Sequence, residues 1–125
     1  MPGLVYDAGA LIAAERNDRR MWALHARALA RGVLPRVPAG AVVETWRGSE
    51  QPSLSKLLEG CRIEPLDHAN ARRAGALLRA AVAGAVDATV VEAAARHAAT
   101  VVTSDRSDIS RLASAAGLRL TIIDV

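Results

Sequence analysis

Acidic residues in this 125-residue chain follow short apolar runs, at the points where strands should end and helices begin. The five that share this setting are Asp7, Glu44, Asp87, Asp105 and Asp108. Carboxylates brought together repel one another and resist burial, so a fold gathers them only when a bound partner offsets that cost. A divalent cation is the simplest such partner, and hard oxygen ligands suit Mg²⁺. The pattern therefore indicates a metal-dependent enzyme, while helix capping is the structural alternative for Asp87 and for one of Asp105 and Asp108.

The elements that must position these residues alternate along the chain. Strands are expected at 4–6, 33–38, 61–66, 100–103 and 120–123, and helices at 8–15, 18–30, 41–46, 54–58, 67–82, 88–97 and 108–115. Such alternation predicts an α/β fold with a mostly parallel central sheet of about five short strands, flanked by helices. In sheets of this kind the ligand crevice lies outside the carboxyl ends of the strands. Asp7 and Asp105 directly follow strands, so we expect both at that edge.

Composition limits the class of protein. Residues 1–125 are enough for one domain with a real core, and no apolar run is long enough to span a membrane. The single cysteine, Cys61, rules out an internal disulfide and fits the reducing cytoplasm. The net charge of +3 comes almost wholly from arginine, which indicates either a composition bias or a phosphate-binding surface. With only three aromatic residues, a base-stacking platform is not expected.

Four short motifs resemble, in their order, those of the PIN-domain ribonucleases. They are Asp7-Ala8-Gly9-Ala10-Leu11 after the first strand, Val43-Glu44-Thr45, Val86-Asp87-Ala88-Thr89-Val90-Val91, and Val102-Thr103-Ser104-Asp105-Arg106-Ser107-Asp108-Ile109. The resemblance runs from Leu4 to Ile123, and the small size of the chain is similar to that of the VapC toxins of bacterial VapBC toxin–antitoxin pairs. On this resemblance, residues 1–125 form a PIN domain.

The resemblance implies a Mg²⁺- or Mn²⁺-dependent endoribonuclease that leaves 5′-phosphate and 3′-hydroxyl ends. It implies that Asp7, Glu44, Asp87 and Asp105 form the catalytic quartet, and that Asp7, Asp87, Asp105 and Asp108 hold the metal. A metal-activated water would then attack the RNA phosphodiester. Arg47 and Arg106 flank the acidic motifs and are expected to contact RNA phosphates.

Partners also follow from the resemblance. A VapB-like antitoxin is expected to silence the site by inserting a basic side chain. The partner to be cut is RNA, and related toxins differ in whether they cut transfer RNA, ribosomal RNA or other targets. A homodimer is expected as well, with the helices around Trp22 and Leu54–Leu58 as the suggested interface. The alternative function is a catalytically silent PIN-like module that binds RNA or protein.

Two positions depart from the family pattern. Gly9 stands where the family commonly has Ser or Thr, so a hydroxyl near the metal is missing there, and Ile109 replaces the usual aromatic residue. Outside the motifs, Glu92 and the three histidines are expected at the surface. A phospho-receiver domain is disfavoured, because the first strand ends in one Asp and the only lysine is Lys56. A P-loop or dinucleotide-binding enzyme is disfavoured more strongly still, since no glycine-rich phosphate loop follows the first strand.

Overall fold

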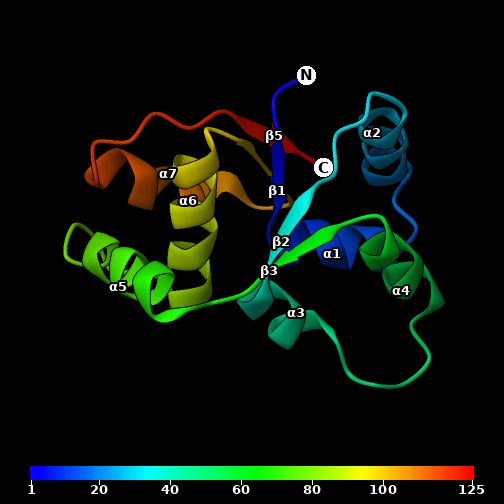
Figure 1. Ribbon diagram of the computed structural model, residues 1–125, viewed down its shortest axis with the longest axis horizontal. Helices are drawn as coiled ribbons and strands as arrows, with labels where there is room; N and C mark the ends of the chain where they lie inside the picture. The colour runs from blue at the N-terminus through cyan, green and yellow to red at the C-terminus, as the bar shows by residue number, and fades with distance from the viewer.

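Five parallel strands form one sheet between two layers of helices in the computed structural model, which describes residues 1–125 (Figure 1). The strands are β1 (Leu4–Tyr6), β2 (Arg36–Pro38), β3 (Arg62–Glu64), β4 (Thr100–Thr103) and β5 (Ile122–Asp124). The helices are α1 (Ala8–Glu15), α2 (Arg19–Ala30), α3 (Ala39–Thr45), α4 (Pro52–Glu59), α5 (His68–Leu77), α6 (Ala85–His97) and α7 (Arg106–Ala115). The predicted α/β architecture is confirmed, and every strand pair is parallel.

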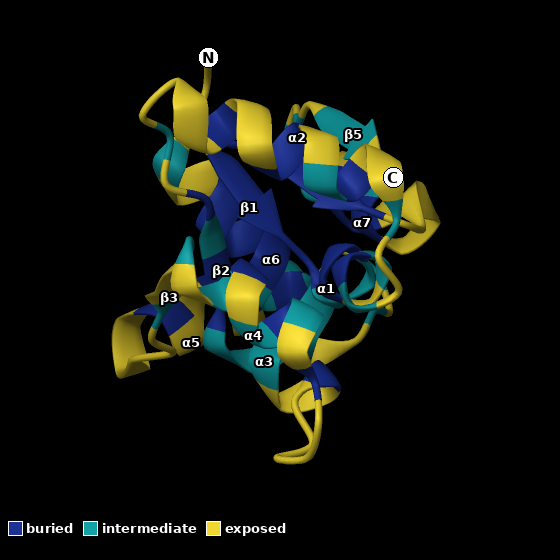
Figure 2. Cartoon of the chain, turned by 90° about the vertical axis from the view of Figure 1, so that its right-hand side faces the viewer, coloured by how far each residue is buried: buried dark blue, intermediate teal, exposed yellow.

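Alternation along β1 divides the interior into two cores. Leu4 and Tyr6 point to the face covered by α1 to α4, whereas Val5 points to the face covered by α5, α6 and α7. Figure 1 shows these two groups of helices on opposite sides of the sheet, and Figure 2 shows β1 as a buried strand with the outward turns of α2 exposed. Burial on both faces explains why β1 is a continuous apolar run and why β4 has two valines between buried threonines.

The strand order β3-β2-β1-β4-β5 contains a switch point between β1 and β4. The chain leaves β1 toward β2 and β3 on one side, then crosses through α5 and α6 to β4 on the other. Tyr6, the last residue of β1, pairs with Val102 of β4. The residues that follow these two strands therefore start close together, at the edge where ligands bind in open α/β sheets.

Several helix boundaries differ from the prediction. Helix α5 ends at Leu77 instead of continuing to residue 82, because Val82 is 88% exposed and burial gains nothing from a longer helix. Helix α6 begins at Ala85 with Gly84 as its N-cap, which places Asp87 in the first turn rather than at the cap. Helix α7 likewise begins at Arg106, so Asp105 is its cap and Asp108 lies in its first turn.

A buried aromatic cluster ties α2 to the sheet. The Tyr6 hydroxyl lies 2.9 Å from Nδ1 of His25, and the Trp22 ring meets the His25 ring edge-on at 5.7 Å. The Trp22 indole nitrogen donates to the Ala14 carbonyl at 2.9 Å, so the cluster also holds the end of α1. His25 is 4% exposed, so the expectation that it lies at the surface is wrong: it occupies the inner face of α2. Burial lowers the pKa of His25.

No helix is both long and apolar enough to cross a membrane. The large hydrophobic side chains of α4 are committed to the core of this chain, since Leu54 and Leu57 have no exposed surface. The suggested dimer interface around Leu54–Leu58 therefore cannot use these two side chains.

Candidate active site

Asp7 sits at the carboxyl end of the central strand and is 6% exposed. Its carboxylate accepts a hydrogen bond of 2.9 Å from the Ala10 amide, which makes Asp7 the N-cap of α1 and fixes the side chain. Burial raises the pKa of Asp7, the Thr103 hydroxyl and the Ala10 amide oppose that rise, and the charge of Asp87 adds to it. The capping role and the site role therefore coexist in one residue.

Asp87 lies at the electrostatic centre of the acidic residues. It is half-buried in the first turn of α6, and its pKa is raised first by burial and then by the charges of Asp108, Glu44 and Asp105. Arg111 partly offsets that rise. The charges of Asp108, Glu44 and Asp105 act on Asp87, and the charge of Asp87 acts on Asp7, so the five predicted acidic residues are linked electrostatically, although no three of them converge into a closed metal site.

The remaining acidic residues are more exposed than Asp7 and Asp87. Asp105 caps α7 and accepts hydrogen bonds from the Ser107 amide at 3.1 Å and the Ser107 hydroxyl at 2.8 Å, which lower its pKa. Asp108 forms an ion pair of 3.0 Å with Arg111. The Arg111 guanidinium also donates to the Val82 carbonyl, at 2.6 Å, and so links α7 to the segment that follows α5.

Glu44 reaches this edge because α3 packs tightly on α6. A Cβ atom at Gly40 would lie 3.2 Å from a methyl group of Val86, so a larger residue there would push the two helices apart. Glu44 follows Gly40 by four residues, one turn further along the same face of α3. The close approach at Gly40 therefore places an exposed Glu44 within the field of Asp87.

The donor set fits a hard divalent cation that keeps much of its water. No three acidic, histidine or cysteine side chains lie close enough together to form a closed metal site. Mg²⁺ is commonly held by only one or two carboxylates, together with waters and phosphate oxygens. Asp7 and Asp87 would be the residues to hold such an ion, because burial raises the pKa of both carboxyl groups and the charge of Asp87 also raises the pKa of Asp7.

Gly9 has a steric reason to lack a side chain. A Cβ atom there would overlap the Ser104 hydroxyl, lie 3.1 Å from the Ser104 amide nitrogen, and lie 3.3 Å from Oδ1 of Asp7. The first turn of α1 thus packs against the segment after β4, and the Ser104 hydroxyl occupies the space that a side chain at position 9 would take. The presence of Ser104 therefore explains why position 9 is a glycine in this chain and not the Ser or Thr that is common in the family.

The arginines expected to contact RNA are engaged within the chain. The Arg47 guanidinium donates to three carbonyls at the end of α3, those of Val43, Glu44 and Trp46, at 2.7 to 3.2 Å. The Arg106 guanidinium donates hydrogen bonds of 2.7 and 3.0 Å to the Asp124 carboxylate. Both side chains stabilise the frame of the acidic edge, and their proposed contact with RNA would require these bonds to open.

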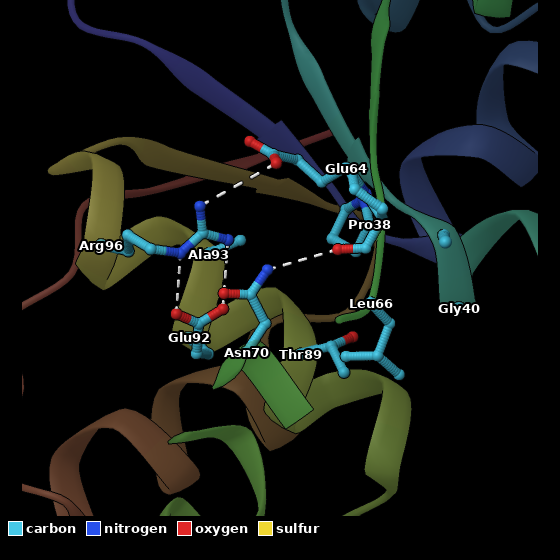
Figure 3. Close-up of a pocket in the computed structure, with 11 residues that line it drawn as sticks. Pro38, Gly40, Glu64, Leu66, Asn70, Thr89, Glu92, Ala93 and Arg96 are labelled. Carbon is cyan, nitrogen blue, oxygen red and sulfur yellow. Dashed lines mark hydrogen bonds and ion pairs between the residues drawn. The ribbon is translucent and has the colours of Figure 1, made fainter. Parts of the chain in front are cut away.

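A separate ionic network lies beside the acidic edge, around a cavity of about 10 Å³ that is at the lower limit for one water molecule. Glu92 is 6% exposed and pairs with Arg73 at 3.2 Å and Arg96 at 2.9 Å, so its expected surface location is wrong. Arg96 also lies 3.9 Å from Glu64, as Figure 3 shows. His97 lies 2.7 Å from the other oxygen of Glu64. The network joins α6 to α5 and to the end of β3.

Several residues that contact or position the acidic residues could not be recognised from the sequence alone. Thr103 is fully buried, lies against Asp7, and accepts a 3.0 Å hydrogen bond from the Asp105 amide. Ser104 and Arg111 act through packing and an ion pair that only the folded chain reveals. Gly40 was detectable in principle, because a glycine one turn before an acidic residue on a helix marks a close approach.

The parallel sheet and its acidic edge define an α/β domain whose candidate site lies at the carboxyl ends of the central strands. A model of the PIN domain matches residues 4–115, so the chain belongs to the PIN domain family. Members of this family are in general nucleases that depend on divalent metal ions. No curated protein matches the sequence.

The fold is shared with several solved structures, among them the following three. VapBC2 from Rickettsia felis, bound to a DNA fragment from its promoter, contains a chain with a TM-score of 0.74 and 15% identity, with 98% of each chain covered. A toxin–antitoxin complex from Klebsiella pneumoniae gives a TM-score of 0.66 at 17% identity, covering 86% of this chain and 91% of the other. FitAB bound to a DNA fragment gives 0.63 at 19% identity, covering 97% and 94%. At such identities the likeness concerns the fold alone, and the fold is that of chains from toxin–antitoxin complexes.

Proposed function

We propose that this chain is a Mg²⁺- or Mn²⁺-dependent endoribonuclease that acts as the toxin of a toxin–antitoxin pair. The observation that carries the proposal is the electrostatic setting of Asp87. Its half-buried carboxyl group lies in the field of Glu44, Asp105 and Asp108, and its own charge acts on the buried Asp7. Membership of the PIN domain family supplies the class of reaction.

Each acidic residue has a proposed role in that reaction. Asp7 and Asp87 would hold the ion, with Asp105 and Asp108 completing its surroundings through bound water. The ion would supply an acidified water and balance charge on the phosphodiester. Glu44, exposed on α3, would orient water or substrate at the outer side of the site. Water would add to phosphorus, and the bond to the 3′ oxygen would break, which leaves 5′-phosphate and 3′-hydroxyl ends.

The proposal is tested by cleavage of purified transfer and ribosomal RNA with Mg²⁺, with Mn²⁺ and with EDTA. Asp7→Asn should lower the rate by at least about a hundredfold, because the removed charge is the one most closely tied to the site. Glu59→Gln, an exposed carboxylate at the end of α4, should leave the rate unchanged. Full activity of Asp7→Asn, or cleavage in EDTA, would contradict the metal-dependent mechanism.

The proposed partners follow the likeness to toxin–antitoxin complexes. A VapB-like antitoxin would bind the acidic edge with a basic side chain, and a homodimer acting in the cytoplasm would cut RNA when the antitoxin is lost. Expression of the chain alone should slow growth, and Asp7→Asn should relieve that effect.

The alternative function is a catalytically silent module that binds RNA or protein. The openness of the donor set favours it, since no three ligating side chains converge. The same assay separates the two functions: a folded protein that binds RNA but does not cut it with either metal would be a binding module.

A further inference from the structure

A groove continues from the acidic edge along α1. It has a volume of about 250 Å³, and its walls are formed by Gly9, Ile12, Ala13, Arg16, Asp18, Ser104 and Val125. Gly9 and Ser104 belong to both the groove and the acidic edge, because a Cβ atom at Gly9 would lie 3.3 Å from the Asp7 carboxylate and against Ser104. The groove therefore lies next to Asp7, which is not itself one of the lining residues.

The α1 wall of the groove is one face of a helix. Gly9, Ile12, Ala13 and Arg16 follow the spacing i, i+3, i+4 and i+7. The small residues leave room beside the acidic edge, and Ile12 keeps 38% of its surface exposed. Arg16 lies about 10 Å further along the helix axis. Arg16 is the C-cap of α1 and lines the groove beyond the end of that helix.

Arg16 is the only basic side chain that lines the groove. The arginines closest to the acidic edge are all engaged: Arg47 with carbonyls, Arg106 with Asp124, and Arg111 with Asp108. The Arg16 side chain, in contrast, is exposed and forms no hydrogen bond or ion pair within the chain. Asp18, the other charged residue of the groove, is the N-cap of α2, where its carboxylate accepts a hydrogen bond of 2.8 Å from the Met21 amide.

We propose that this groove holds the RNA strand on one side of the cut and that Arg16 binds a backbone phosphate near the scissile one. The inference rests on the proposed ribonuclease function and adds a substrate-binding residue to it. A free guanidinium matches phosphate oxygens, and the small residues before it admit a ribose-phosphate backbone. Ile12 offers the apolar surface of the groove to a ribose or a base edge. A phosphate contact of this kind positions the strand without reading its sequence.

The test is binding of a fluorescein-labelled, 20-nucleotide single-stranded RNA of mixed sequence, followed by anisotropy with Mg²⁺ at several salt concentrations. Asp7→Asn is the background, so that the RNA is not cut. Arg16→Ala should weaken binding about tenfold and reduce the slope of log K against log salt by about 0.7, the value for one phosphate contact with a single strand. Arg16→Lys should keep the slope, because it keeps the charge.

Arg31→Ala is the matched control, since Arg31 is equally exposed but ends α2, at the start of the connection to β2. It should change neither the affinity nor the slope. Equal losses in the two variants, no loss in Arg16→Ala, or no salt-dependent binding by the background protein would each overturn the inference. If Asp7→Asn still cleaves RNA, the proposed mechanism fails instead, and that result is seen in the cleavage assay independently of Arg16.

Discussion

The acidic residues of the site fall into two groups by their surroundings. Asp7 is buried and Asp87 is half-buried, and burial raises the pKa of both carboxyl groups. Asp105 is open to solvent, and hydrogen bonds from Ser107 lower its pKa. Ionising Asp7 and Asp87 therefore costs free energy in the folded protein, and a bound cation would offset that cost. Ionising Asp105 carries no such cost. Capping explains the position of Asp7 and Asp105, but it does not explain why Asp87 lies among four other acids.

This difference predicts opposite effects of two neutral substitutions on the metal-free protein. A raised pKa means that the folded state disfavours the charged form at neutral pH, so Asp7→Asn should raise the melting temperature, provided that the amide oxygen keeps the cap to Ala10. Asp105→Asn removes a charge that the folded state favours and should give no rise. Thermal unfolding in EDTA measures both.

Added Mg²⁺ provides the control for this prediction. It should raise the melting temperature of the unsubstituted protein and leave that of Asp7→Asn unchanged, because only the former retains the full donor set. A lower melting temperature for Asp7→Asn in EDTA would contradict the argument from burial.

At the scale of the elements, two glycines set the distances between the layers that carry the site. Gly9 lets α1 approach the segment after β4, and Gly40 lets α3 approach α6. Helix α6 is in turn held to α5 and β3 by the Glu92 network. The site is thus assembled from four separate pieces of chain, and its geometry depends on contacts that contain no acidic site residue.

Gly9→Ala should destabilise the protein by about 1–3 kcal/mol, because the new methyl group overlaps the Ser104 hydroxyl. Ser104→Ala in the same chain should recover part of that loss, which a double-mutant cycle by chemical denaturation would measure. Gly75→Ala is the control, because nothing lies within 4 Å of a Cβ atom there and alanine favours the helix by about 1 kcal/mol. Equal effects at positions 9 and 75 would refute the steric explanation.

Glu92→Ala should lower the free energy of unfolding by about 2 kcal/mol, since it leaves Arg73 and Arg96 without their buried partner. The loss is smaller than for a fully buried pair, because the two arginine side chains are 52% and 27% exposed. Glu59→Ala, at an exposed position on α4, should cost less than about 0.5 kcal/mol. Urea denaturation of the two variants decides whether the network stabilises the fold.

For the whole molecule, the sequence pattern was sufficient to predict the sheet and the edge that carries the acids. The apolar segments Leu4–Tyr6 and Thr100–Thr103 match the observed strands, because strands buried on both faces give an unambiguous run of apolar residues. The end of α5 was missed, because alanines after Leu77 keep a helical pattern although Val82 remains exposed. Helix length there was decided by burial, which a local pattern does not contain.

The candidate site was predicted unevenly for the same reason. Residues that follow strands, such as Asp7, could be placed from topology alone. The roles of Ser104 and Arg16 depend on how α1 packs against the end of β4, and nothing in their local sequence marks that contact. His25 and Glu92 were assigned to the surface, because a polar side chain on a helix gives no sign of which partner it will meet.

The stability of the whole fold should fall as the pH drops below about 6.5, the ordinary pKa of histidine. Burial lowers the pKa of His25, so the unfolded chain binds its proton more readily than the folded one. The stability contributed by neutral, buried His25 is therefore fully present above about pH 6.5 and is lost as the pH falls toward the lowered pKa of the folded protein. Denaturation at pH 7, 6 and 5 measures it; His25→Gln should flatten this dependence, and the exposed His68→Gln should not.

The cluster around His25 also gives this chain a built-in optical signal. The two tryptophans of the chain differ in their contacts and exposure. Trp22 packs against His25 and donates a hydrogen bond to α1, whereas Trp46 is 40% exposed. A Trp46→Phe background would leave one emitter, located where α1 and α2 meet and close to the strand that leads into Asp7. Each unfolding experiment described above can then be followed by intrinsic fluorescence, without a label and without disturbing the acidic edge.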